Sequence, residues 1–167
     1  MKAAKFLSTL FLSLGLSTVA HANIMQTTCT IQTIKGYYLT AVGGGGRVQD
    51  VIHSDAVRVG AWEKFKFIDS RTGTPNIQYG IRTTGSRYLT AVGGGGRISD
   101  VIHSDATILN DWEKFRAIYL GNGWYALQTV NGRYLTAVGG GGRTTDVLHS
   151  DAVNIGDWEK FRINCGM

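Results

Sequence analysis

The segment YLTAVGGGGR, residues 38–47, is the main evidence for the architecture because the sequence contains it three times. It recurs as residues 88–97 and 134–143, at offsets of 50 and then 46 residues. Each copy is followed by an Asp, by His-Ser-Asp-Ala and then by Trp-Glu-Lys-Phe. Self-similarity at a fixed period indicates one supersecondary unit used repeatedly. We number the units repeats 1 to 3, spanning approximately residues 27–71, 76–120 and 122–167.

Each repeat contains four short segments in which apolar residues alternate with period two, as half-buried strands require. In repeat 1 these segments lie near residues 27–34, 37–42, 48–54 and 63–69. The turn signals between the first two segments are Lys35-Gly36, Gly85-Ser86 and Asn131-Gly132. The residues expected on one buried face are Phe65 and Phe67, then Phe115, Ala117 and Tyr119, then Phe161, Ile163 and Cys165, with Ile31, Ile81 and Leu127 on the first strands.

Four strands in each of three repeats predict an all-β protein of twelve strands. Three units would not close a propeller, and a solenoid would need atypical terminal repeats, whereas these terminal repeats resemble the middle one. A closed six-stranded barrel capped by three hairpins fits the pattern best. The predicted fold is therefore a β-trefoil of three pseudo-symmetric four-stranded repeats.

The Tyr-Leu-Thr-Ala segment, the glycine run and Trp-Glu-Lys-Phe resemble the fascin-like β-trefoil family over the whole chain after residue 22. The resemblance implies either a secreted carbohydrate-binding module or a protein-binding module of the actin-bundling kind. No repeat contains Gln-x-Trp, so the sugar-binding residues of ricin-type trefoils are not carried over.

Residues 1–22 have the pattern of a secretory signal peptide. Lys2 and Lys5 precede an apolar run over residues 6–16, and Ala20-His21-Ala22 provides an A-x-A cleavage site. The run is too short to span a bilayer, which needs about 20 residues. We expect cleavage after Ala22, a β-trefoil domain over residues 23–167, and a secreted or periplasmic location.

In an oxidising compartment the two cysteines are expected to form a disulfide. Cys29 and Cys165 lie near the two ends of the predicted domain, where barrel closure would bring the first and last strands together. Two free buried thiols are the alternative.

Composition excludes several classes of function. The formal net charge of +5 falls to +3 once Lys2 and Lys5 are removed, and basic residues are interleaved with acidic ones. This distribution argues against nucleic-acid binding. No segment after residue 22 is long and apolar enough to suggest a membrane span.

The strongest candidates for ligand contact are polar residues that repeat although a core does not require them. Arg and His donate hydrogen bonds and carboxylates accept them, a combination that orients a polyol in a shallow pocket. By contrast, residues 48–49, 98–99 and 144–145 differ between repeats, as solvent-facing positions without a role would. The candidate set is Arg47, Asp50, His53 and Asp55, then Arg97, Asp100, His103 and Asp105, then Arg143, Asp146, His149 and Asp151.

Two alternatives explain the same polar residues. They could form an internal network in which Asp pairs with Arg and Ser-Asp makes a local turn. They could also be identical because the repeats duplicated recently, although the first strands have diverged strongly.

The glycine runs at residues 43–46, 93–96 and 139–142 are expected between the second and third strands of each repeat. They would serve either a tight turn or close approach by a partner. Trp62, Trp112 and Trp158 are possible sugar-stacking platforms, but their position just before a core strand favours packing.

Metal binding and catalysis have little support in the sequence. One His per repeat without a second close ligand is weak for zinc, and Asp-x-Asp-x-Asp calcium loops are absent. Adjacent His, Ser and Asp cannot form a triad. We therefore expect a non-catalytic binding module without cofactor or metal, binding glycans or glycoconjugates at up to three equivalent sites. The alternatives are an actin- or host-protein-binding module and an enzyme inhibitor.

Overall fold

The computed structural model describes residues 28–70 and 77–166, so the signal peptide predicted for residues 1–22 lies outside the described residues. Twelve strands and four short 3-10 segments make up the described chain. The strands are β1 (Thr28–Gln32), β2 (Tyr38–Ala41), β3 (Ile52–Ala56), β4 (Phe65–Asp69), β5 (Tyr79–Arg82), β6 (Tyr88–Ala91), β7 (Ile102–Ala106), β8 (Lys114–Gly121), β9 (Trp124–Gln128), β10 (Tyr134–Ala137), β11 (Leu148–Ala152) and β12 (Phe161–Cys165). The 3-10 segments are η2 (Val42–Gly44), η3 (Val92–Gly94), η4 (Asp111–Glu113) and η5 (Val138–Gly140).

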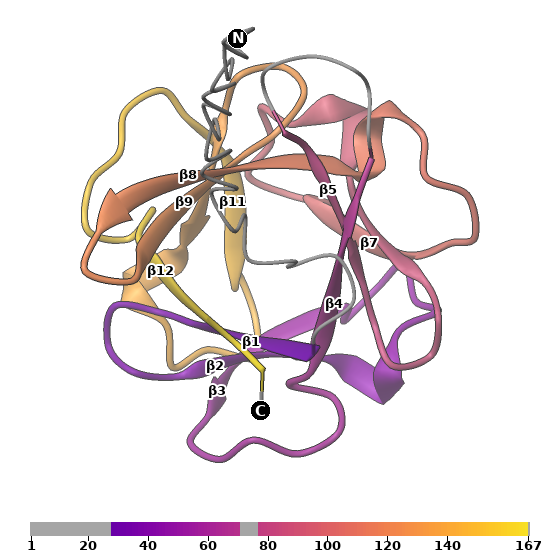
Figure 1. Ribbon diagram of the computed structural model, residues 1–167, viewed down its shortest axis with the longest axis horizontal. Helices are drawn as coiled ribbons and strands as arrows, with labels where there is room; N and C mark the ends of the chain where they lie inside the picture. Colours follow the sequence, from indigo (N-terminus) through magenta and orange to yellow (C-terminus); the bar gives the residue numbers. More distant parts are fainter. Residues whose placement is uncertain (1–27, 71–76, 167) are drawn as a thin grey trace, which may run out of the picture.

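Six strands close into a barrel, and the fold is the predicted β-trefoil. Antiparallel pairing runs from β1 to β4, β5, β8, β9, β12 and back to β1. The remaining six strands form the hairpins β2–β3, β6–β7 and β10–β11. The first and last strands lie side by side (Figure 1), with Cys29 opposite Cys165, and these two cysteines form the predicted disulfide.

The barrel interior is filled by the residues that the alternation selected. Phe65, Phe67, Phe115 and Phe161 are almost completely buried, and Ile31, Ile81 and Leu127 join them in one core cluster. The prediction was wrong for Cys165, which is exposed at the end of β12, and for Tyr119, which is 62% exposed. Tyr119 lies where β8 continues as far as Gly121, in a ribbon paired with β9.

The third strand of each repeat begins later than the sequence predicts, at Ile52 rather than near residue 48. Asp50, at φ +49°, interrupts the extended backbone, and its equivalents Asp100 and Asp146 adopt φ +48° and +49°. Left-handed backbone is uncommon for residues other than glycine, but Asp tolerates it better than most. The segment after each glycine run therefore curls before it enters the strand.

Within the described ranges, no helix is both long and apolar enough to cross a bilayer.

Candidate functional site

The glycine run forms the turn between β2 and β3, as expected, and all four glycines have positive φ. The values are +68°, +80°, +103° and +85° for residues 43 to 46, and the other repeats match them closely. Such a succession is accessible only to glycine without strain. The run therefore meets a conformational requirement of the turn.

The turn places an Arg, an Asp and a His beside one another at the surface, and we call this group the ion cluster of each repeat. In repeat 1, Nη2 of Arg47 lies 3.3 Å from Oδ2 of Asp50, and Nε2 of His53 lies 2.6 Å from Oδ1 of the same carboxylate. Repeats 2 and 3 reproduce these contacts, with Arg–Asp distances of 3.3 Å and His–Asp distances of 2.7 Å. The clusters consist of Arg47, Asp50 and His53, of Arg97, Asp100 and His103, and of Arg143, Asp146 and His149.

Asp55 belongs to the same outer surface but not to the ion cluster. Along β3, Ile52 and Ser54 are buried whereas His53 and Asp55 face outward. No hydrogen bond or ion pair within the described residues engages the Asp55 side chain, and the same holds for Asp105 and Asp151. Each of these carboxylates is exposed to solvent and able to accept hydrogen bonds from an incoming group.

The serine of each His-Ser-Asp triplet joins neighbouring repeats, a role that sequence reasoning missed. Ser104 is fully buried, and its backbone N–H donates to the carbonyl oxygen of Arg47 at 2.8 Å. Its hydroxyl oxygen accepts from the Arg47 backbone N–H at 3.2 Å. Ser150 binds Arg97 and Ser54 binds Arg143 in the same way, so the three links close a ring. The internal-network alternative is thus confirmed for the pairing of Asp with Arg, and wrong for the serine, which lies within a strand and not in a local turn.

The glutamate of each Trp-Glu-Lys-Phe segment is a second structural residue that sequence reasoning missed. Glu63 is only 8% exposed. Its Oε1 accepts from Thr40 Oγ1 at 2.7 Å, and its Oε2 accepts from the backbone N–H of Gly60 at 2.6 Å. Glu113 and Glu159 repeat the arrangement with Thr90 and Thr136. The exact repetition of Thr and Glu at a separation of 23 residues was a signal that could have found this pair.

The tryptophans are more exposed than their position suggested. Trp62, Trp112 and Trp158 are 48%, 50% and 49% exposed, so packing accounts for only half of each side chain. A Cβ placed on Gly44 would lie 3.6 Å from Cδ1 of Trp62, and one on Gly43 would lie 3.9 Å from Cδ of Arg47. In repeat 1 the indole and the arginine therefore flank neighbouring glycines of one turn. In repeat 2, Trp112 also lines a hollow of about 310 Å³.

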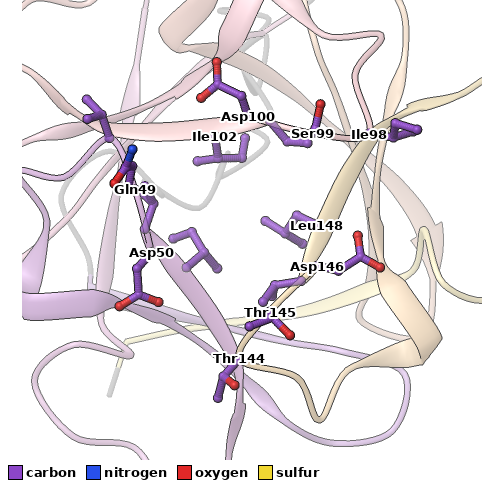
Figure 2. Close-up of a pocket in the computed structure, with 15 residues that line it drawn as sticks. Gln49, Asp50, Ile98, Ser99, Asp100, Ile102, Thr144, Thr145, Asp146 and Leu148 are labelled. Carbon is purple, nitrogen blue, oxygen red and sulfur yellow. The ribbon is translucent and has the colours of Figure 1, made fainter.

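A larger cavity of about 740 Å³ is lined by equivalent residues of all three repeats. Residues 48–49, 98–99 and 144–145 are exposed, as expected for solvent-facing positions, and line this cavity together with the three aspartates. In Figure 2, Ile102 and Leu148 point into this space, whereas the carboxylates of Asp50, Asp100 and Asp146 point away from its centre. The three histidines of the ion clusters are not among the residues that line this cavity. The cavity is largely apolar and differs in character from the ion clusters.

Comparison with known proteins confirms the fold. The designed threefold-symmetric protein ThreeFoil matches with a TM-score of 0.68 at 14% identity, over 81% of this chain and 96% of its own. SeviL bound to asialo-GM1 saccharide matches with a TM-score of 0.60 at 18% identity, over 84% and 98%. The Rhizoctonia solani agglutinin matches with a TM-score of 0.67 at 15% identity, over 84% and 96%.

No protein-family model matches the sequence, and no curated protein shows significant similarity to it. The similarities to solved structures establish a β-trefoil and leave the fascin-like assignment a prediction. None of the three neighbours is described as an actin-binding protein.

Proposed function

We propose that this protein is a lectin-like carbohydrate-binding module with up to three equivalent sites, one at each ion cluster. The observation that carries the proposal is the threefold repetition of an exposed Arg-Asp-His cluster beside the glycine turn. Each repeat also has a half-exposed tryptophan, which in repeat 1 lies against the same glycine turn. An aromatic face and a few oriented polar groups are the elements that sugar recognition uses. The names of two neighbours, an agglutinin and a saccharide-bound protein, are consistent with this class of ligand.

The chemistry of each site suits a neutral polyol. The Asp50 carboxylate already accepts from Arg47 and His53, which fixes the directions of these side chains. The guanidinium keeps further N–H donors free, and the outward Asp55 carboxylate offers acceptors. A sugar hydroxyl both donates and accepts, so it can engage both groups at once. Repetition of weak sites would raise the avidity for a surface that carries many copies of the sugar.

The proposed module is non-catalytic and exported. A disulfide joining the barrel's first and last strands fits an oxidising compartment. The signal peptide over residues 1–22 remains part of this proposal.

A glycan array probed with the purified protein tests the proposal, followed by calorimetry on the strongest hit. We expect a stoichiometry approaching three sugars per chain. Replacing His53, His103 and His149 together with alanine should abolish binding, because each cluster loses one donor and the fixed position of its carboxylate.

The matched control replaces Arg116 with alanine. Arg116 is exposed on the barrel strand β8, opposite Gln128, and belongs to none of the clusters. The control should bind sugar as the native protein does, and both variants should keep the native circular dichroism spectrum. An array without hits at high protein concentration would contradict the proposed function, and unchanged affinity in the triple-histidine variant would contradict the proposed residues.

A further inference from the structure

A pocket of about 190 Å³ lies where repeats 1 and 2 meet, on the barrel strands β1, β4 and β5. Three of its lining side chains are cationic: Lys64, Lys66 and Arg82. Hydroxyl-bearing residues, among them Thr28, Thr84 and Ser86, complete the polar lining. The pocket therefore contains hydrogen-bond donors and positive charge without a carboxylate.

Among the described residues, none of these three cations forms an ion pair. All twelve Asp and Glu residues of the sequence fall within the described ranges. Lys66 and Arg82 also stand directly opposite each other in the β4–β5 register. Like charges in that arrangement repel, and a bound anion would relieve the repulsion.

Arg82 contributes a donor that the protein leaves unused. Its Nε is buried without a hydrogen-bond partner among the described residues. The guanidinium carbon lies 5.9 Å from the centre of the Tyr88 ring, which helps to hold the side chain in place. A buried donor without a partner costs free energy unless a ligand or water satisfies it.

The other two repeat junctions show that this pocket departs from the threefold pattern. Lys114 and Lys160, the counterparts of Lys64, donate to Asp111 and Asp157, and this contact lowers the pKa of the Asp157 carboxyl. Repeat 1 has Ala61 at that position, which leaves its lysine unpaired.

The turn between β5 and β6 also differs from the equivalent turns of the other two repeats. Gln32 and Gln128 occupy the positions equivalent to Arg82, and their side-chain amides donate to the carbonyl oxygens of Gly36 and Gly132. Arg82 cannot make this amide contact, and Ser86 stands where the other repeats have Gly36 and Gly132, although the φ of Ser86 is +64°. Residues that break local preferences in one copy only are expected at functional sites.

We propose that this pocket binds a tetrahedral oxyanion, a sulfate or phosphate group, either free or as a monoester. Lysine and arginine form charge-assisted hydrogen bonds to such groups, and hydroxyls supply further donors. The side chains of Thr84 and Trp62 both lie against Gly44, so a sugar carrying the anion would place its ring beside an exposed indole. The proposal does not depend on the three sugar sites proposed above.

An amide-resolved NMR titration tests it, with sodium sulfate, sodium phosphate, glucose 6-sulfate and glucose as probes at constant ionic strength. We expect saturable shifts at the turn formed by residues 83–86, with a dissociation constant of about 1 mM for the anions. The corresponding turns at residues 33–36 and 129–132 should not respond. Tighter binding of glucose 6-sulfate than of sulfate would identify an ester as the preferred form, and equal binding would identify the free anion.

Two substitutions restore the residues that the other repeats carry, so both should fold. R82Q and A61D should each weaken sulfate binding roughly tenfold or more, since each removes or neutralises one charged donor. R116Q is the matched control because it removes one arginine from another repeat junction, at the position equivalent to Lys66 and opposite Gln128. Equal losses in R82Q and R116Q, shifts at all three turns, or no saturation up to about 50 mM would overturn the site. Glycan binding at the ion clusters is tested separately on the glycan array, so none of these outcomes decides whether those sites bind sugar.

Discussion

Two neighbouring glycines of one turn should respond very differently to alanine. Gly45 has φ +103° and ψ −173°, a region that only glycine occupies readily, and a Cβ there would lie 2.5 Å from Oγ1 of Thr83. Gly46 has φ +85°, but a Cβ there would meet no atom within 4 Å. Gly46→Ala therefore adds backbone strain alone, whereas Gly45→Ala adds strain and a collision with the next repeat.

The expected magnitudes follow from these two terms. Strain costs about 1–3 kcal/mol at Gly45, and overpacking against Thr83 adds about 1–3 kcal/mol, so Gly45→Ala should lose about 4 kcal/mol. Gly46→Ala should lose about 1 kcal/mol. For a domain of this size, these losses correspond to falls in Tm of roughly 8–16 °C and 2–4 °C.

Urea and thermal unfolding of both variants measure the difference, and Thr83→Ala in the Gly45→Ala background should recover about 1–2 kcal/mol by removing the colliding atoms. Equal losses at Gly45 and Gly46, or no recovery in the double variant, would refute the packing argument. Because a Cβ at Gly46 would meet no atom of the protein, Gly46→Ala also tests whether a ligand approaches the backbone at this residue. Loss of sugar binding with little loss of stability would assign that glycine a role in access.

Further predictions concern the disulfide, the buried glutamate and one tyrosine. Replacing Cys29 and Cys165 with serine opens a loop of 136 residues and should cost about 4–5 kcal/mol, read as a lower urea midpoint that a reducing agent no longer changes. Glu63→Gln turns one acceptor into a donor facing Thr40 or a backbone N–H and should cost about 2 kcal/mol in the same assay, while a neutral effect would contradict the network. Burial, followed by the nearby Asp69 carboxylate, raises the pKa of Tyr79, so its contribution to stability is complete below pH about 10 and declines as the pH rises further. In unfolding measured as a function of pH, Tyr79→Phe should reduce the loss of stability above pH about 10. An unchanged pH profile would contradict the role given to Tyr79.

The fold could be predicted because the three internal repeats of the sequence indicate threefold symmetry. Three copies of one unit, alternating apolar residues and glycine-containing turns limit the architecture to a closed threefold barrel. Strand boundaries were less accessible, since the left-handed backbone at Asp50 is not visible in the residue pattern. Tyr119 was misplaced because alternation identifies a shared face but does not show where a strand leaves the barrel.

The roles of the repeated polar residues were only partly predictable. The link between Ser104 and Arg47 crosses 57 residues and two repeats, and spacing within one repeat carries no information about such a partner. The cavity lined by residues 48–49 and their equivalents likewise exists only once the three hairpins are assembled. The changes at Ala61 and Arg82 are visible in the sequence, but only the structure shows that Lys64, which Ala61 leaves without an Asp partner, lines the same pocket as Arg82.

Repetition alone does not separate structural from functional residues, and the exposure of the repeated side chains supplies a second criterion. The buried Ser54 and Glu63 are repeated because each completes hydrogen bonds whose loss would be costly inside the protein. The ion clusters cannot be explained in that way. Their Arg and Asp side chains are 40–51% exposed, and pairs in such positions typically contribute only about 0–1 kcal/mol. The clusters contribute little to stability and yet keep one geometry in all three repeats, and this observation supports the proposal that they contact a ligand.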